Sequence, residues 1–342
     1  MRTSVLGLIG ILALGVSAGP AAQVVTNDGP YKITQNARLN YAASAHIYDA
    51  ALDRIYSSTR GGIYTVDGSS RKVLGQTASV RGTGSISLDA ARGELYVLAL
   101  HEDALRVVDV TTHKIVRSFP APAWFNVFYE PGRGELYYLR GDKTSMQVAD
   151  RMTGKTLATI ELGGRPAYLL DDQERHRLLV RLADQPKIQV IDTVDHSVTA
   201  SWASRRDGAT SMALDTKNNR VFTTAGKDIV MLDGTTGAEL GRAPTSDVAF
   251  SMVYDAEVGY LLALSGGGEV TVVKADGGAL KTVQRLDAAA WIQDLYLDPA
   301  RRRVIGLSRV VDENLMWDVA AQAPVNGPTA MISFTPRLSN SG

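Results

Sequence analysis

The sequence predicts an all-β fold, a seven-bladed β-propeller built from four-stranded antiparallel blades, on two observations. An acidic residue precedes a short apolar run by six positions seven times, at Asp49, Asp89, Glu130, Asp172, Asp215, Asp255 and Asp298. Successive acidic residues are 40 to 43 residues apart, and each interval holds several short apolar runs separated by turn residues. A repeat of this length, rich in short strands, is typical of propeller blades.

The first 22 residues are predicted to be a secretory signal peptide. Arg2 gives a positive start, residues 5–16 form an apolar run too short to span a bilayer, and small residues follow from Ser17 to Ala22. Residues 23–342 are then expected to form a single propeller domain. The alternative interpretation of the apolar run is a buried first strand or helix.

Composition narrows the class of protein further. The chain has 36 Lys plus Arg against 36 Asp plus Glu, so net charge gives no specific signal for nucleic acid or an anionic membrane. It has no Cys, which excludes disulfides, thiolate metal sites and a Cys nucleophile. With the predicted signal, these features indicate a periplasmic or secreted bacterial protein. We expect a monomer without a membrane span once the signal is removed.

Residues 166–203 show the repeating unit most plainly. Strands are expected at residues 167–170, 177–182, 187–191 and 197–202, with short polar turns between them. Four short strands joined by such turns form one antiparallel meander, which is one blade.

A second acidic residue closes the third strand of units one to five, at Asp67, Asp109, Asp150, Asp192 and Asp233; Lys274 takes this place in unit six. The turn that follows puts Gly154 and Gly237 where a left-handed backbone is expected. His113 and His196 occupy the same place, so we predict that both histidines are turn residues. The repeating carboxylates are interpreted as structural before catalytic.

The two ends of the chain are predicted to share the last blade. Unit seven supplies strands at residues 294–297, 303–307 and 330–334, and then lacks a fourth. Residues 31–37 match the place of a fourth strand. We expect this N-terminal strand to pair with residues 330–334 and close the ring, which would remove exposed sheet edges.

A family resemblance is carried by units two to four. The segments Val148-Ala-Asp150, Thr153-Gly-Lys155 and residues 159–166 (TIELGGRP), with second strands at residues 95–97 and 136–138, resemble the YVTN-type β-propeller repeat. The resemblance spans residues 31–336, and its G-x-x-P element occurs only at Gly163 to Pro166. It implies an exported seven-bladed ring without an established catalytic centre, and therefore a binding or scaffold role without a cofactor.

One face of the predicted ring collects the loops from strand four to the next strand one and from strand two to strand three. The residues there that suit a small anionic ligand or a protein partner are Arg81, Trp124, Phe125, Asn126, Arg165, Arg205, Arg206, Trp291 and Trp317. Arginines beside exposed aromatic rings bind anions through charge-assisted hydrogen bonds and stacking. Alternatively, these side chains pack under neighbouring loops.

Residues 309–329 are the longest departure from the repeat. They form a second-to-third hairpin far longer than the others and include six apolar side chains, at Val310, Val311, Leu315, Met316, Trp317 and Val319. Loops of this length inside a compact domain are usually functional or disordered. The segment is interpreted either as a lid or docking arm, or as a plug that packs on blade seven.

An enzyme of the propeller lyase or hydrolase kind is the alternative function. It would use His46 or His101 with a nearby carboxylate as the acid–base pair. The five histidines show no H-x-H or H-E-x-x-H spacing and no G-x-S-x-G motif occurs, so no metal site is predicted. The Asp-x-x-Thr-Gly turns resemble part of a quinoprotein repeat but lack its following Trp, so no quinone cofactor is expected. For His46, the structural alternative is a core or channel-lining histidine.

Overall fold

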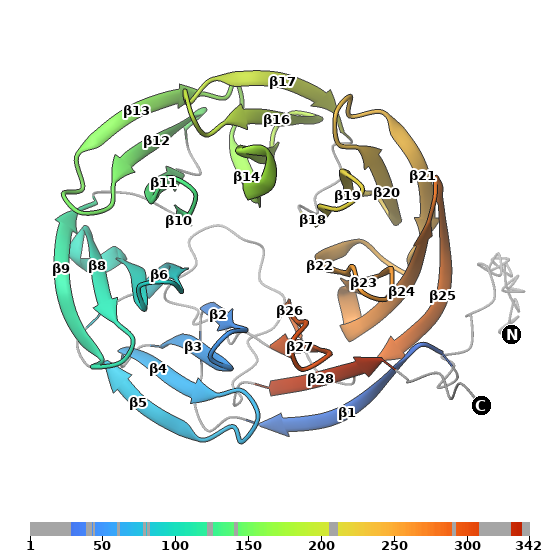
Figure 1. Ribbon diagram of the computed structural model, residues 1–342, viewed down its shortest axis with the longest axis horizontal. Coiled ribbons are helices and arrows are strands. Elements are labelled where there is room, and N and C mark those ends of the chain that lie inside the picture. Colours follow the sequence, from blue (N-terminus) through green and yellow to red (C-terminus); the bar gives the residue numbers. More distant parts are fainter. Residues whose placement is uncertain are drawn as a thin grey trace, which may run out of the picture.

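The structure is a computed structural model that describes residues 29–38, 43, 45–59, 62–77, 80, 83–121, 126–139, 143–204, 211–288, 292–307 and 330–336. Its described strands form seven four-stranded antiparallel sheets. Figure 1 shows these sheets arranged around a common centre, with the first strand of each innermost and the fourth outermost. The predicted all-β propeller of four-stranded blades is confirmed.

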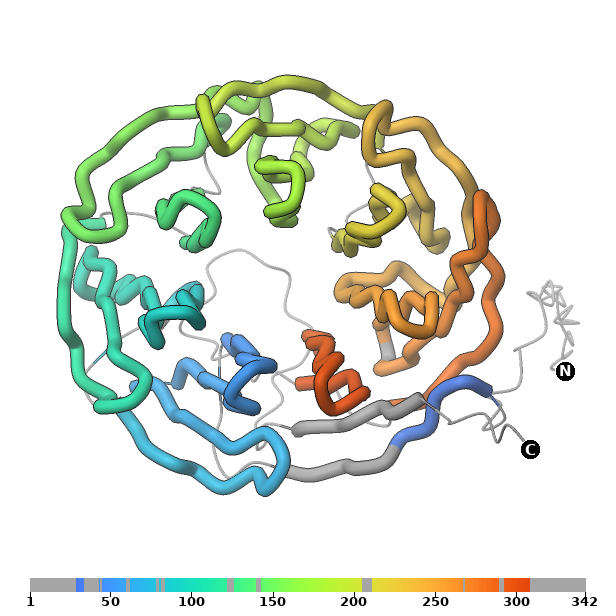
Figure 2. The backbone as a smooth tube through the Cα atoms, in the orientation of Figure 1, coloured from blue at the N-terminus to red at the C-terminus, as the bar shows by residue number. Residues whose placement is uncertain are grey.

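Sheets one to three contain β2 (Ala45–Asp49), β3 (Arg54–Thr59), β4 (Gly62–Asp67), β5 (Val73–Thr77); β6 (Thr83–Asp89), β7 (Glu94–Ala99), β8 (Ala104–Asp109), β9 (Lys114–Pro120); and β10 (Asn126–Glu130), β11 (Glu135–Leu139), β12 (Ser145–Asp150), β13 (Thr156–Glu161). Sheets four to six contain β14 (Pro166–Asp172), β15 (Arg177–Leu182), β16 (Lys187–Asp192), β17 (Val198–Ala203); β18 (Met212–Asp215), β19 (Arg220–Ala225), β20 (Asp228–Asp233), β21 (Glu239–Pro244); and β22 (Ala249–Asp255), β23 (Tyr260–Ser265), β24 (Glu269–Asp276), β25 (Ala279–Asp287). Figure 2 shows the backbone passing from one sheet to the next in sequence order.

Sheet seven combines the two ends of the described chain. Its strand order is β1 (Tyr31–Arg38), β28 (Ala330–Pro336), β27 (Arg303–Leu307) and β26 (Asp294–Asp298). β1 runs antiparallel to β28, with Tyr31 opposite Pro336 and Arg38 opposite Ala330. The predicted pairing of the N-terminal strand with the last strand is therefore confirmed. Whether this pairing holds the ring closed against unfolding stays a prediction.

β1 is also fixed to sheet six through Tyr31. Its backbone N–H donates to Gln284 Oε1 at 2.9 Å, and its carbonyl accepts from Gln284 Nε2 at 2.7 Å. The Tyr31 hydroxyl donates to Asp255 Oδ2 at 2.8 Å. The ring is fully buried and packs edge-on against Tyr260, so its polar tip and its apolar body both find partners.

The hydrophobic core lies between neighbouring sheets. One cluster joins Phe222 and Met231 of sheet five to Leu261 and Ala263 of sheet six, all fully buried. Another joins Tyr48, Ile55 and Val66 of sheet one to Ile305 and Leu307 of sheet seven. The second and third strands of each sheet supply most of these side chains, because adjacent sheets cover both of their faces. Their sequences are therefore rich in apolar residues.

The ends of the sheets form two distinct faces of the ring. We call the turn face the one that carries the first-to-second and third-to-fourth turns, such as residues 215–220 and 233–238, which bond through Gly234 N–H to Asn219 carbonyl at 2.8 Å. The loop face carries the second-to-third hairpins and the connections between sheets. In the turns, Gly154 and Gly237 have φ of 71° and 72°, and His113 and His196 have φ of 58° and 60°. The predicted left-handed turn positions are confirmed.

Candidate functional site

The seven repeating carboxylates are structural. They are at most 6% exposed. Six of them accept backbone hydrogen bonds from the turns that follow them, and Asp172 accepts from the side chains of Arg175 and Arg177. Glu130, for example, accepts from the N–H groups of Gly132 and Arg133 at 2.7 and 2.8 Å. Such a carboxylate accepts the hydrogen bonds that water would otherwise accept from the turn N–H groups. Its removal would leave these N–H donors without an acceptor. The structural interpretation of these residues is confirmed.

Tyrosines connect several of these carboxylates to a neighbouring sheet. The hydroxyl of Tyr48 in sheet one donates to Asp298 of sheet seven at 2.6 Å. Burial, followed by this hydrogen bond, raises the pKa of Tyr48 well above its usual value. Burial, followed by a hydrogen bond to Asp89 of sheet two, does the same to Tyr129 of sheet three. These hydroxyls therefore stay protonated and act as donors.

The histidines are also largely engaged by the fold. His113 Nε2 lies 3.0 Å from Thr65 Oγ1, and His196 Nε2 lies 2.8 Å from Glu135 Oε2, so each turn histidine contacts the preceding sheet. His46, on β2, is 7% exposed and its Nδ1 lies 2.9 Å from Ser57 Oγ. His101 is exposed in a short 3₁₀ turn, Leu100–Glu102. The catalytic alternative at His46 and His101 remains a prediction.

Metal binding is tested by side-chain geometry. Within the described ranges, no group of three or more His, Asp or Glu side chains is arranged to hold a metal ion. In the same part of the chain, no helix is long and apolar enough to cross a bilayer.

Two of the nine residues predicted on the loop face are described. Arg81, Trp124, Phe125, Arg205, Arg206, Trp291 and Trp317 lie outside the described residues, as does the segment 309–329. Asn126 begins β10, and its Oδ1 accepts from Ser85 Oγ of sheet two. Arg165 precedes β14; its N–H donates to Asp184 Oδ1 at 2.8 Å and its Nε lies 3.6 Å from Asp184 Oδ2. Its side chain is half exposed, so binding through Arg165 remains a prediction.

A second exposed ion pair on the loop face also joins a second-to-third hairpin to a connection between sheets, with the charges exchanged. Asp184 belongs to a second-to-third hairpin, whereas Arg165 belongs to the connection that precedes β14. In sheets five and six, the hairpin residue is Lys227 and the connection residue is Asp247, 3.3 Å apart. Exposed pairs of this kind contribute about 0–1 kcal/mol, so they leave the charges available to a competing ligand.

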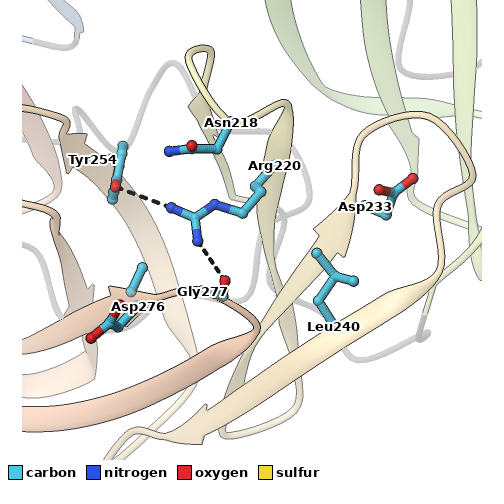
Figure 3. A pocket seen from close by; sticks show the side chains of 8 residues that line it. Asn218, Arg220, Asp233, Leu240, Tyr254, Asp276 and Gly277 are labelled. Atoms are coloured by element: carbon cyan, nitrogen blue, oxygen red, sulfur yellow. Dashed lines mark hydrogen bonds between the residues drawn. The ribbon is translucent and has the colours of Figure 1, made fainter.

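A pocket lies on the opposite face, between the turns of sheets five and six. It has a volume of about 490 Å³ and is lined by Asn218, Arg220, Asp233, Leu240, Tyr254, Ala275, Asp276 and Gly277 (Figure 3). Sequence reasoning placed the binding residues on the loop face and did not find this pocket. The signal that could have pointed to it is the irregular turn of unit six, where Lys274 replaces the usual Asp and Gly277-Gly278 form a short hairpin.

Arg220 is the central side chain of this pocket. It is 8% exposed; its Nε donates to Asp215 Oδ2 at 2.8 Å, and its Nη1 donates to the Gly277 carbonyl at 2.7 Å. Burial raises the pKa of Asp215, but hydrogen bonds from Asn218 and Arg220 outweigh it, and the net pKa lies below the usual value. The buried ion pair is therefore charged at neutral pH.

Comparison with known proteins supports the fold alone. No protein-family model matches the chain, and no curated protein matches it in sequence. Among solved structures, it is similar to a chain of the mitotic checkpoint complex, with a TM-score of 0.71, 13% identity, and coverage of 96% of this chain and 99% of that chain.

Two further solved structures agree. The β-propeller domain of Cps50 (Swd1) from Myceliophteria thermophila has a TM-score of 0.66 at 12% identity, covering 89% of this chain and 99% of that chain. A chain of hydrazine synthase from Kuenenia stuttgartiensis has a TM-score of 0.65 at 12% identity, covering 85% and 96%. At such low identity, these similarities show a shared fold and do not show a shared activity.

Proposed function

We propose that this chain is an exported β-propeller that serves as a binding or scaffold module, and that its loop face binds a small anionic ligand or a protein partner. One observation carries the proposal. The seven repeating carboxylates and both turn histidines are used by the fold, whereas the arginines and tryptophans that suit binding lie in the segments between the repeating turns. Side chains outside the repeating turns are the ones a propeller can devote to recognition.

The pairing of Arg165 shows how an anion would be accepted. Its side chain is half exposed, and its Nε lies 3.6 Å from Asp184 Oδ2. A carboxylate or phosphate can replace Asp184 with a bidentate contact, because the surface ion pair that it displaces contributes about 0–1 kcal/mol. Arg205, Arg206 and Trp291 come from connections to β18 and β26 and would extend the same face.

The test compares partners recovered by the wild type and by a loop-face variant. The protein is purified natively from the periplasm, and bound molecules are identified by mass spectrometry. We expect the triple variant Arg165→Ala, Arg205→Ala, Trp291→Ala to lose the bound species. Arg242→Ala is the matched control, because Arg242 is exposed on the outer strand β21 and pairs with Glu239 and Asp228. A triple variant that recovers every wild-type species would place the binding surface elsewhere.

Export is tested separately. The intact mass of the purified protein should correspond to a chain that begins between residues 19 and 23, as expected after cleavage of the signal. A mature chain that still begins at Met1 would refute the signal peptide while leaving the loop-face proposal open to its own test.

A further inference from the structure

Three boundaries between sheets share one arrangement on the turn face. Arg177, Arg220 and Arg303 each begin the second strand of a sheet and donate through Nε to the acidic residue of that sheet, at 2.8 to 2.9 Å. Each guanidinium also donates to a backbone carbonyl in a turn of the next sheet, from Gly234, Gly277 and Gly68 respectively. The three arginines therefore bridge sheets four and five, five and six, and seven and one.

The boundaries differ in one position of the next sheet, the left-handed residue of its first-to-second turn. Asn219 places Oδ1 2.6 Å from Arg177 Nη2. Asp53 accepts a hydrogen bond from Arg303 through Oδ1. The corresponding residue beside Arg220 is Gly259, with φ of 72°, which has no side chain to offer.

The space around these positions confirms the difference. A Cβ placed on Gly234 would overlap Asn219 Oδ1, and one placed on Gly68 would overlap Asp53 Oδ1. A Cβ placed on Gly259 would have Ala275 carbonyl as its nearest atom, at 3.8 Å, and one on Gly277 would have nothing within 4 Å. The position that an acceptor side chain fills at two boundaries is thus open at the third, next to Ala275, which lines the pocket.

The guanidinium of Arg220 retains hydrogen-bonding capacity. Nε and Nη2 are used by Asp215 and Tyr254, and Nη1 donates to Gly277. Because each Nη carries two N–H groups, one on Nη1 has no partner among the described residues. Figure 3 shows Arg220 at the centre of the view, with Tyr254 to its left, Gly277 below it and Leu240 to the lower right.

We propose that this pocket is a binding site for a neutral carboxamide group, whose oxygen accepts from the Nη1 N–H of Arg220 that has no partner among the described residues. A second carboxylate is disfavoured, because Asp215 already neutralises Arg220 and the lining adds two further carboxylates, Asp233 and Asp276. An amide presents the same acceptor oxygen without this repulsion, and its NH₂ group can donate to the acidic lining.

The pocket is larger than a carboxamide alone. Its volume of about 490 Å³ can hold a whole polar side chain with part of its backbone, and Leu240, 40% exposed, offers an apolar wall to the methylene groups. The carboxamide can come from free asparagine or glutamine, or from such a side chain within a polypeptide.

The test is a titration of the full-length mature protein with three probes, followed by the Arg220 Nε–H signal in NMR spectra. N-acetyl-L-asparagine N′-methylamide represents the polypeptide source and L-asparagine the free amino acid. N-acetyl-L-aspartate N′-methylamide, which has a β-carboxylate and no primary carboxamide, is the charged analogue. We expect at least one carboxamide probe to shift the signal and to bind at least tenfold more tightly than the carboxylate. The relative affinity of the first two probes identifies the source.

Two matched variants establish that the site is the pocket. Gly259→Asn adds a carboxamide side chain next to Ala275, which lines the pocket, and Asn tolerates the left-handed backbone there, so it should obstruct the pocket and weaken probe binding. Gly163→Asn is the control, because Gly163 also has a φ of 69° and nothing within 4 Å of its Cβ, but lies on the loop face. Three results would each overturn the proposal: no probe binding to the wild type, tighter binding of the carboxylate, or undiminished binding by Gly259→Asn.

Discussion

The boundary between sheets seven and one and the boundary between sheets five and six are built on the same plan, yet only one of them is filled. At the first, Asp53 accepts from Arg303, Tyr48 and Ser69. At the second, the corresponding residue is Gly259, which has no side chain, and Arg220 lines a pocket. A single left-handed turn position can therefore switch a sheet boundary between closed and open, because Gly, Asn and Asp all tolerate that backbone.

Removing the acceptor side chain Asp53 at the boundary between sheets seven and one should have the largest effect on stability. Asp53→Gly keeps a residue suited to the φ of 54° but removes a buried carboxylate that neutralises Arg303. We expect a loss of about 3 kcal/mol in the free energy of unfolding, because a buried charge loses a partner. Urea unfolding followed by tryptophan fluorescence measures it. A loss below about 1 kcal/mol would mean that Asp298 alone satisfies Arg303.

Replacing the neutral acceptor Asn219 with Gly should lower the free energy of unfolding by less than Asp53→Gly does. Asn219→Gly removes the hydrogen bonds from Arg177 and to Thr235 and keeps the left-handed backbone. We expect a loss of about 1.5 kcal/mol, the usual range for a hydrogen bond to a charged group. The neighbouring residue Asn218 is less suitable for this test, because its side chain also bonds Asp215. If Asn219→Gly costs as much as Asp53→Gly, the charge of the acceptor is unimportant.

Closing the open boundary should stabilise the protein. Gly259→Asn fills the position that Asn219 and Asp53 hold at the other two boundaries and reduces the conformational freedom of the unfolded chain. We expect a gain of about 1 kcal/mol in urea unfolding without any ligand, whereas Gly163→Asn should give no gain. Destabilisation by Gly259→Asn with unchanged Gly163→Asn would show that the pocket cannot accept a side chain at this angle.

The smallest effect on stability is expected at Asp171, where a carboxylate stands in place of a tyrosine hydroxyl donor. Asp171 precedes Asp172, at the position that Tyr48 and Tyr129 hold in sheets one and three. Burial, followed by the charge of Glu130, raises the pKa of Asp171 to about 6. Its protonated form therefore stabilises the fold below about pH 4, and this contribution is lost as the pH rises through 6.

Asp171→Asn should remove that pH dependence. After allowance for solvent screening, we expect the variant to be about 0.5 kcal/mol more stable than the wild type at pH 7, and the difference to vanish or reverse at pH 4. Unfolding curves at both pH values measure it, with Glu174→Gln, at an exposed carboxylate, as the control. An equal difference at the two pH values would exclude titration of Asp171 as its origin.

The fold could be predicted from the sequence, because the spacing of the repeat and the residues of its turns can be recognised along the chain. The strands expected at residues 177–182 and 303–307 match β15 and β27, and those at 167–170 and 197–202 differ from β14 and β17 by one or two residues at each end. The left-handed places of His113 and His196 also follow from spacing alone.

The pocket could not be predicted in the same way. It depends on Arg220, Gly259 and Gly277, which belong to different turns, and on whether a side chain from one sheet reaches another. The periodic pattern shows that Gly259 replaces Asn219 or Asp53, but glycine there fits a turn equally well. Contacts such as Arg165 with Asp184 likewise require the hairpin and the connection to be placed in space.

The pairing of β1 with β28 also constrains the order in which the chain can fold. Sheets one to six are each continuous in sequence, so each can form soon after its own residues become available. Sheet seven must wait for strands nearly 300 residues apart, and contacts of such separation form slowly. Until then the edges that β1 and β28 will cover remain open to other chains. Completion of the last sheet is therefore expected to be the step at which aggregation competes most strongly with folding.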